Sequence, residues 1–241
     1  IVGTDPDSDR VGILVKNDKG EYVTFTGNQV GTLLSEYILS ALAEKNAVPK
    51  DGYIVKTIVT TNIIQAICDA YGIEMKEVLT GFKFIGEKIK ESEENGIGTY
   101  IFGFEESYGC LIGTHARDKD AIVATMALCE AAAYYKKQGK TLWDQMLAIY
   151  DKYGYYKDSV KSVTMKGIEG LAKIAQTMEN LRANAPENIG PYKVLQARDY
   201  KLDTCKNMET GEVTPTGLPQ SNVLYLSLIH ISEPTRRRGI S

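Results

Sequence analysis

The first part of the chain carries two kinds of hydrophobic pattern. Val11–Val15 and Tyr22–Phe25 are rich in β-branched and aromatic residues and flank an Asn-Asp-Lys-Gly turn, so they predict a β-hairpin. Apolar positions then recur every three or four residues, which predicts an amphipathic helix capped by Asn28. The segment 47–52, which contains a proline and a glycine, predicts a domain boundary after this helix.

Strand-like and helix-like segments alternate from residue 53 to residue 154. The predicted strands are Tyr53–Thr60, Ile73–Leu79 and Thr99–Phe102. Three predicted helices run from Asn62 to Tyr71, from Phe84 to Ser92 and from Thr141 to Tyr153. A further, long helix is predicted to be capped by Asp120 and to carry Ile122, Thr125, Met126 and Cys129 on one face. Such alternation is typical of a layered α/β domain.

The pattern changes from Tyr155 onwards. A strand around Ser159–Met165 is predicted to precede one helix at Ile168–Leu181 and a looser, strand-rich stretch. The predicted fold class is therefore α/β, with a layered α/β domain followed by a small, incomplete α+β C-terminal domain. The predicted units are residues 1–48, 49–154 and 155–226, followed by a tail at 227–241.

Composition narrows the function classes. The 241 residues carry a net charge of −3, which gives no electrostatic signature of nucleic-acid binding. No apolar run approaches the roughly 20 residues that a membrane helix needs, so no membrane partner is expected. Because the chain begins with Ile-Val-Gly-Thr, we expect it to start inside a longer gene product.

The four cysteines are scattered and form no CxxC pair, so we expect neither a zinc site nor a disulfide framework. Reduced thiols and a cytoplasmic location are the corresponding expectation. Cys68 and Cys129 fall within helical patterns and are predicted to be small core residues. With only two histidines, His115 and His230, a histidine-based metal cluster or a Ser-His-Asp triad is nearly excluded.

The most informative motif is Asp-Pro-Asp-Ser-Asp-Arg at residues 5–10. Alternating carboxylates from Asp5, Asp7 and Asp9 suit a hard cation such as Mg²⁺ or Ca²⁺, and Arg10 suits a phosphate beside it. An EF-hand loop would need glycine and glutamate where Arg10 and Lys16 stand, which excludes that kind of calcium site. A solvated acidic turn is the alternative for this motif alone.

Three further polar segments follow predicted strands or open a helix, at 79–83, 102–109 and 116–120. Glu105 and Ser107 could bind sugar hydroxyls, with a solvated acidic turn as the alternative. Arg117 and Lys119 belong to a run of charges that could neutralise one another at the surface. Alternatively, Lys119 could serve in acid–base chemistry.

The order of these segments resembles the α-D-phosphohexomutase family, in particular its phosphoglucomutase branch. The sequences that carry the resemblance are DPDSDR, LTGFKFIGEKI, FGFEESYG and ARDKDAI, and it covers about residues 1 to 226. Family members have three similar α/β domains and a smaller fourth, with the active site in the central cleft. The resemblance therefore implies an internal fragment with the end of domain two, all of domain three and part of domain four.

The resemblance also implies roles for individual residues. Asp5, Asp7 and Asp9 would bind Mg²⁺, together with the phosphate of a phosphoserine. Arg10 would approach that phosphate or the sugar, and Lys119 would be an acid or base. The substrate-binding residues would be Glu105, Ser107, Thr80, Gly81, Lys83 and Arg117. Some family members have histidine where this chain has Gly109, so a histidine-based acid–base role does not transfer.

The implied reaction interconverts glucose 1-phosphate and glucose 6-phosphate through a hexose bisphosphate and an enzyme phosphoserine. The family's serine lies upstream of the metal loop and has no match here, since Ser8 lies inside that loop; we therefore expect the isolated chain to be inactive. The alternatives are a phosphomannomutase or phosphopentomutase, a Mg²⁺-dependent phosphatase with an aspartate nucleophile, and a non-catalytic fragment that binds Mg²⁺ or sugar phosphate. The sequence carries no signal for an oligomeric state.

The C-terminal residues depart from the family pattern. Where a family member would have an R-P-S-G-T-E-P phosphate-binding loop, only a serine and a Glu-Pro pair are similar. Residues 227–241 are therefore predicted to be an out-of-frame or adapter-derived tail, with a divergent phosphate loop as the alternative. On this interpretation His230 has no catalytic role, and Arg236–Arg238 belong to a solvated tail.

Overall fold

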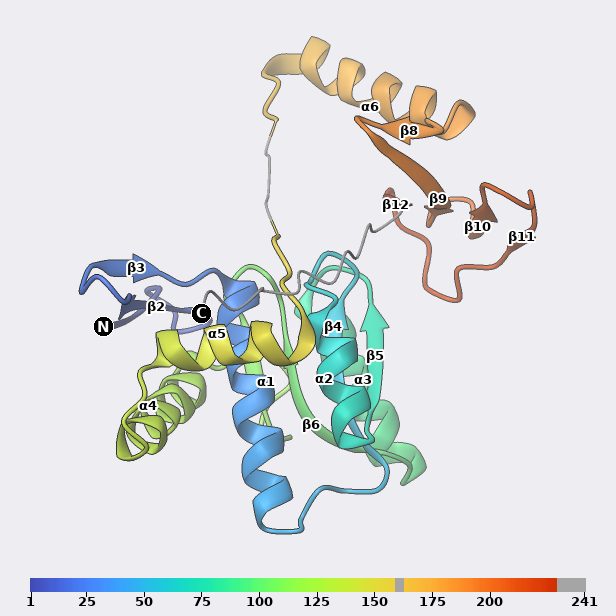
Figure 1. Ribbon diagram of the computed structural model, residues 1–241. Helices are drawn as coiled ribbons and strands as arrows, with labels where there is room; N and C mark the ends of the chain where they lie inside the picture. Colours follow the sequence, from blue (N-terminus) through green and yellow to red (C-terminus); the bar gives the residue numbers. More distant parts are fainter. Residues whose placement is uncertain (159–162, 229–241) are drawn as a thin grey trace, which may run out of the picture. The chain divides into compact units, whose positions relative to one another are not determined.

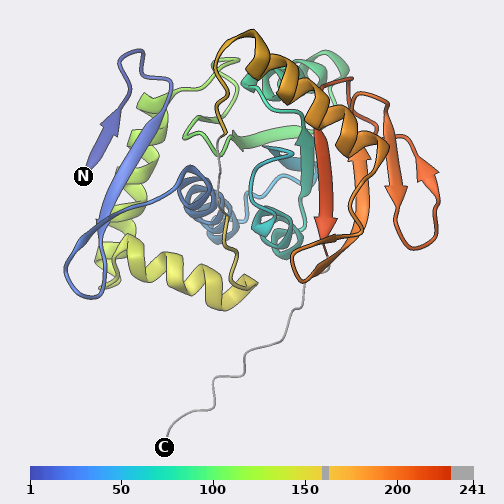
Figure 2. The same ribbon diagram turned by 90° about the horizontal axis from the view of Figure 1, so that it is seen from above.

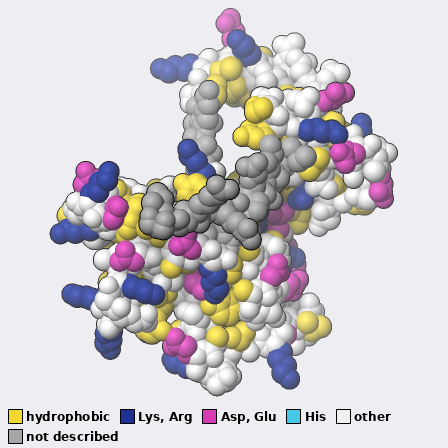
Figure 3. All heavy atoms as spheres, in the orientation of Figure 1, with side chains coloured by type: hydrophobic (Ala, Val, Ile, Leu, Met, Phe, Trp, Pro, Cys, Tyr) yellow, Lys and Arg dark blue, Asp and Glu magenta, His cyan; other side chains and the backbone are white. Residues whose placement is uncertain are grey.

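A computed structural model describes residues 1–158 and 163–228 of the chain (Figure 1). The chain divides into two compact units, Ile1–Ser159 and Val160–Ser241. No helix within the described ranges is long and apolar enough to cross a membrane. On the face drawn in Figure 3, basic and acidic side chains are interspersed.

The first unit is built around a sheet with the strand order β5-β4-β6-β7. The strand β4 (Gly52–Thr57) lies between β5 (Glu74–Val78) and β6 (Thr99–Phe104) and is parallel to both, while β7 (Cys110–Ile112) pairs antiparallel with β6. The carboxyl ends of the three parallel strands therefore lie at one edge of the sheet, where ligands bind in open α/β sheets.

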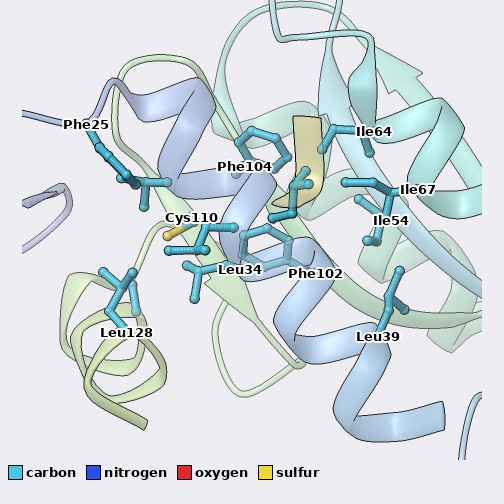
Figure 4. Packing of buried hydrophobic residues seen from close by; sticks show 14 of the residues in the cluster. Phe25, Leu34, Leu39, Ile54, Ile64, Ile67, Phe102, Phe104, Cys110 and Leu128 are labelled. Atoms are coloured by element: carbon cyan, nitrogen blue, oxygen red, sulfur yellow. The ribbon is translucent and has the colours of Figure 1, made fainter. Parts of the chain in front are cut away.

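Helices cover both faces of this sheet, which confirms the predicted α/β fold class. The helices are α1 (Gly27–Glu44), α2 (Ile63–Tyr71), α3 (Phe82–Asn95), α4 (Ala121–Lys137) and α5 (Leu142–Tyr153). Ile54 and Phe102 pack in one cluster with residues of α1, α2, α4 and α5 (Figure 4). Tyr53 and Val55 point to the opposite face, where they pack against α3. In the view from above, α1 and α2 lie side by side (Figure 2).

A second, antiparallel sheet has the order β1-β2-β3, with β1 at Val2–Thr4, β2 at Val11–Lys16 and β3 at Tyr22–Thr24. The predicted hairpin is confirmed, and the Asn17 side chain closes its turn by accepting the amides of Lys19 and Glu21. Alternate residues of β2 join the main hydrophobic cluster. This cluster runs across residue 49, where the boundary is predicted, so the hairpin and α1 belong to the same compact unit as the sheet.

Two details of the predicted helices and strands are wrong. The cap of α1 is Thr26, which forms a capping box with Gln29, while the Asn28 side chain instead accepts the amide of Thr61. The strand predicted to reach Thr60 ends at Thr57, because the Thr60 amide bonds to the Thr57 carbonyl and the two hydroxyls lie 2.7 Å apart.

The predicted apolar face of α4 is also wrong, although Asp120 does cap this helix as predicted. Ile122 and Met126 are 56% and 67% exposed, and Cys129 is exposed as well. The buried side of α4 instead consists mainly of small residues: Ala121, Ala124, Leu128, Ala131 and Tyr135. Small side chains let the helix approach its neighbours closely, so packing overrides side-chain hydrophobicity here. The prediction that Cys68 is buried is confirmed.

Within residues 163–228, the second unit has one helix, α6 (Gly167–Ala183), and an antiparallel sheet with the order β11-β10-β9-β12, which agrees with the predicted α+β type. Its strands are β8 (Asn188–Ile189), β9 (Tyr192–Asp199), β10 (Thr204–Asn207), β11 (Val213–Thr214) and β12 (Leu224–Leu228), and β8 pairs with β9. Arg182 of α6 lies 3.2 Å from the carboxylate of Asp199 and links the helix to the sheet.

Some predictions fall wholly or partly outside the described residues. Positions 159–162 of the strand predicted at Ser159–Met165 lie outside them, and positions 163–165 form no strand. Ser227 and Leu228, at the start of the predicted tail, belong to β12. The rest of that tail, with His230 and Arg236–Arg238, is outside the described residues.

Candidate active site

The acidic motif forms the loop between β1 and β2. Its first carboxylate, Asp5, accepts the backbone amides of Asp9 and Arg10, both at 3.0 Å, and the Nε of Arg10 at 2.6 Å. The Arg10 amide and the Arg10 guanidinium together lower the pKa of Asp5 to about 2. Asp5 thus organises the loop from inside, while Asp7 is exposed and makes no hydrogen bond to another described residue.

The Asp5 carboxyl is expected to titrate near pH 2 instead of its ordinary 3.8. Because its pKa is lower in the folded than in the unfolded chain, its contribution to stability is present above about pH 4 and is lost as the pH falls toward about 2. An NMR titration of the aspartate carboxyl carbons measures this directly. Arg10→Gln should raise the Asp5 midpoint, and a wild-type midpoint near 3.8 would contradict the prediction.

Backbone hydrogen bonds join this loop to two other predicted segments. Arg10 forms a β-bridge with Gly109, and the Val11 amide donates to the Tyr108 carbonyl at 3.1 Å. The Ala121 amide, at the start of α4, donates to the Ser8 carbonyl at 2.9 Å. The acidic loop, the loop after β6 and the segment before α4 are therefore held together by main-chain contacts.

The loop after β6 brings Glu105 to the same edge of the sheet. The Oε1 of Glu105 accepts the Gly81 amide at 3.0 Å, which ties this loop to the one after β5. Burial raises the pKa of Glu105, against the opposing effects of the Gly81 amide and of Lys119. The Glu105 amide donates to the Gly109 carbonyl at 2.9 Å and closes the loop, at whose tip Ser107 is exposed.

Lys119 reaches into this arrangement from the segment before α4. Its Nζ lies 3.2 Å from Oδ2 of Asp9, 2.8 Å from Oδ1 of Asp118 and 5.4 Å from the centre of the Phe82 ring. Burial lowers the pKa of Lys119, but its bonds to Asp118 and Asp9 outweigh this and leave the pKa raised. The ammonium group is therefore charged and can donate a proton, whereas it is poorly suited to accept one.

The structure does not bring the remaining predicted residues to the same place. The Arg117 guanidinium turns to Glu93 of α3 and to the carbonyls of Thr114 and Ala116. The ammonium of Lys83 lies 4.8 Å from the centre of the Phe84 ring and is exposed. Thr80 is exposed at the end of the loop that follows β5.

A buried polar network that was not predicted from the sequence lies beneath the site. Lys56 is fully buried at the end of β4, with its Nζ 2.7 Å from Oε2 of Glu77 and 3.3 Å from the Thr57 and Thr60 carbonyls. The Thr57 hydroxyl donates to Glu106 at 3.3 Å and so supports the loop that carries Glu105. A lysine inside an otherwise β-branched strand is the signal that could have identified this network.

The donor set of the acidic loop fits a hard cation, because three carboxylates lie within one short hairpin loop. Among the described residues, however, no group of three acidic, histidine or cysteine side chains is arranged to hold a metal ion. Asp5 is engaged by Arg10 and Asp9 by Lys119, both through rotatable side chains. Cation binding would therefore require these side chains to exchange partners.

Comparison with known proteins identifies curated phosphoglucomutases as relatives of this chain. The phosphoglucomutase of Staphylococcus aureus (strain MSSA476) is 34% identical over 224 residues, which cover 93% of this chain and 40% of that protein. The chain thus spans about 40% of the length of the curated relatives it matches.

Several solved structures are similar to this chain. The Paramecium phosphoprotein pp63/parafusin, a phosphoglucomutase in its open form, has a TM-score of 0.54 and 18% identity over 89% of this chain and 34% of that chain. The Aspergillus fumigatus N-acetylphosphoglucosamine mutase, in complex with GlcNAc-6P and magnesium, has a TM-score of 0.46 and 16% identity over 61% of this chain and 32% of that one. Because its sequence identity is low, the first of these two structures supports only the assignment of the fold. The α/β/α layering described above supports the same assignment.

The family match is the decisive comparison. Residues 26–153 match the family described as phosphoglucomutase/phosphomannomutase, alpha/beta/alpha domain III. This match starts at the cap of α1, so it includes that helix along with the central sheet and ends with α5. Because it covers more than half of the chain, the chain belongs to the phosphoglucomutase/phosphomannomutase family, and residues 26–153 are its domain III.

Proposed function

We propose that this chain is the metal-binding and sugar-recognition part of a phosphoglucomutase that interconverts glucose 1-phosphate and glucose 6-phosphate. The observation that carries the proposal is the convergence of the acidic loop, the Glu105 loop and Lys119, joined through Gly109 and Asp9. The curated relatives at 34% identity are named phosphoglucomutases, which supports glucose over other sugars. A cytoplasmic location is part of the proposal and rests on four unpaired cysteines.

We propose a role for each of the residues that come together at the site. Asp5, Asp7 and Asp9 would hold Mg²⁺, which when bound neutralises charge on a transferring phosphoryl group. Oε2 of Glu105 and the exposed hydroxyl of Ser107 are available to sugar hydroxyls, since Oε1 of Glu105 is occupied by the Gly81 amide. The charged Lys119 can donate a proton to an oxygen that leaves the phosphorus. Arg10 can approach a phosphate once it leaves Asp5.

The proposal also includes substrate-binding roles for Thr80, Gly81, Lys83 and Arg117. The structural support differs from one of these residues to the next. The Gly81 amide supports the site indirectly because it orients Glu105. Thr80 and Lys83 are exposed near the start of α3, where a phosphate could reach them. Arg117 would first have to leave Glu93. The proposed partners are hexose phosphates and hexose bisphosphates.

The test is Mg²⁺-dependent conversion of glucose 1-phosphate to glucose 6-phosphate by the full-length product of the gene, measured in a coupled assay. We expect conversion, and we expect Asp7→Ala to reduce kcat by about a hundredfold, because the transferring group would lose its charge compensation and alignment. Asp18→Ala, in the exposed β2–β3 turn, is the matched control and should leave kcat unchanged. Equal activity of Asp7→Ala and Asp18→Ala would refute the proposed metal role.

The same assay separates the alternatives. Faster conversion of mannose 1-phosphate or of a pentose phosphate would identify that sugar phosphate, and not glucose 1-phosphate, as the preferred substrate. An acid-labile aspartyl phosphate at Asp5 or Asp7, in place of an acid-stable phosphoserine, would identify a phosphatase-type mechanism. The 241-residue chain alone is expected to show no conversion, and measurable conversion by it would contradict the assignment of the phosphoserine to another part of the protein.

A further inference from the structure

We propose that the ammonium group of Lys119 acts as a counter-cation of the acidic loop and thereby lowers the affinity of this loop for divalent cations. The Lys119 side chain can take this position because Gly109 has no side chain. The inference rests on the proposed function only in taking the acidic loop as a cation site. It assigns to Gly109 a positioning role, and to Lys119 a role that is separate from proton transfer.

The first step is the position of the Lys119 ammonium. It lies between two carboxylates, Asp9 at 3.2 Å and Asp118 at 2.8 Å, and its side chain is 17% exposed. Asp118 is 68% exposed, whereas Asp9 is 35% exposed and belongs to the acidic loop. One cation is thus shared between the acidic loop and a solvated carboxylate next to it in sequence.

The second step is the path of the Lys119 side chain over Gly109. A Cβ atom at Gly109 would lie 2.8 Å from Cγ of Lys119 and still closer to its Cδ, which is well inside van der Waals contact. Apart from Lys119, the nearest atom is Oε2 of Glu105, at an unstrained 3.5 Å. Gly109 is not among the residues with a positive φ, so its backbone would accept alanine. Glycine is therefore needed at this position for Lys119 to reach Asp9.

The third step is competition for Asp9. A divalent cation and the Lys119 ammonium cannot both occupy the same side of one carboxylate, so each lowers the affinity of the loop for the other. Asp118 offers Lys119 a second partner when it is displaced, because its Oδ1 already accepts both the amide and the ammonium of Lys119. Displacement consequently exchanges one ion pair for a metal bond without leaving the lysine unpaired.

The experiment is a calorimetric titration of the 241-residue chain with MgCl₂, for the wild type and for Lys119→Ala, Gly109→Ala and the double variant. Removing the competing cation should tighten Mg²⁺ binding by about three- to fivefold in Lys119→Ala, the scale of a partly exposed ion pair. Gly109→Ala should tighten binding similarly, because the added methyl group expels Lys119 from Asp9. The double variant should match Lys119→Ala, since no side chain is left to expel.

Lys19→Ala is the matched control, because it removes the same charge from an exposed lysine in the β2–β3 turn, outside the acidic loop. It should leave the dissociation constant of Mg²⁺ within about a factor of two, the scale expected of a screened surface charge. As a second readout, the NMR signal of the Lys119 Nζ should shift when Mg²⁺ is added to the wild type. Equal dissociation constants for Lys119→Ala and Lys19→Ala would overturn the inference. So would a double variant in which the effects of Lys119→Ala and Gly109→Ala add.

The outcomes distinguish this inference from the proposed function. If the wild type binds Mg²⁺ and Lys119→Ala binds it equally well, the counter-cation role is wrong while the metal site stands. If neither protein binds Mg²⁺ at millimolar concentration, the acidic loop is no cation site and both proposals are wrong. Should Gly109→Ala misfold, as judged by the Trp143 fluorescence, Lys119→Ala still decides between these results.

Discussion

Glu77→Ala is expected to lower the free energy of unfolding of the first unit by about 3–5 kcal/mol. Lys56 is fully buried, and Glu77 provides its carboxylate partner at 2.7 Å. Without Glu77, the partners left to the buried ammonium group among the described residues would be the Thr57 and Thr60 carbonyls, each at 3.3 Å. An uncompensated buried charge is one of the costliest single changes in a protein, because the protein interior replaces little of the lost hydration.

Urea denaturation measures this change, since the sequence contains a single tryptophan, Trp143, which lies in the first unit. Glu74→Ala is the matched control: it removes a carboxylate from the same strand, but one that is 65% exposed and 3.6 Å from Lys76. Its cost should stay below about 1 kcal/mol. Lys56→Met should cost less than Glu77→Ala, because it removes the charge itself. Equal costs for Glu77→Ala and Glu74→Ala would show that Lys56 does not depend on Glu77.

Gly27→Ala is expected to destabilise the first unit by about 1–3 kcal/mol and to move the loop after β6 away from α1. A Cβ atom at Gly27 would lie 2.7 Å from both the carbonyl carbon of Glu106 and the amide nitrogen of Tyr108, and closer still to the Glu106 carbonyl oxygen. These are backbone atoms, which cannot rotate away as a side chain can. The first turn of α1 thus sets the position of the loop that carries Glu105.

Hydrogen exchange detects this movement at two amides. The Glu105 amide donates to Gly109 within the loop, and the Val11 amide donates to Tyr108 across to the hairpin. Both should exchange faster in Gly27→Ala, while Gly12→Ala serves as the control because nothing lies within 4 Å of a Cβ at that position. Unchanged protection of both amides in Gly27→Ala would mean that the contact with α1 does not position the loop.

The strands β4 and β6 of the central sheet could be predicted from the sequence because they are short, mostly apolar runs followed by polar turns. The cap of α1 could have been found as well, since Thr26 and Gln29 have the spacing of a capping box. The short strands β1 and β7, with three residues each, were not predicted, because a segment of that length shows no hydrophobic period.

In the candidate site, too, some features could be predicted from the sequence and others could not. Asp5, Glu105 and Lys119 could be selected from their residue types and their places after strands or before a helix. Their partners could not, because the bonds from Arg10 to Asp5, from Gly81 to Glu105 and from Lys119 to Asp9 depend on how separate segments pack. Arg117 shows that residue type and position in the chain are not sufficient. It lies in a segment that contributes to the site, but its guanidinium pairs with the carboxylate of Glu93 on α3.

The cysteines of the first unit make the stability of the candidate site directly observable. Burial raises the pKa of both the Cys68 and the Cys110 thiol to about 12, so neither reacts with a thiol reagent until its surroundings open. Cys110 begins the strand that follows the Glu105 loop, whereas Cys68 lies in α2. Native-state labelling of these two thiols therefore times two different openings. Faster labelling at Cys110 than at Cys68 would be the kinetic signature of a site that opens while the rest of the unit stays folded.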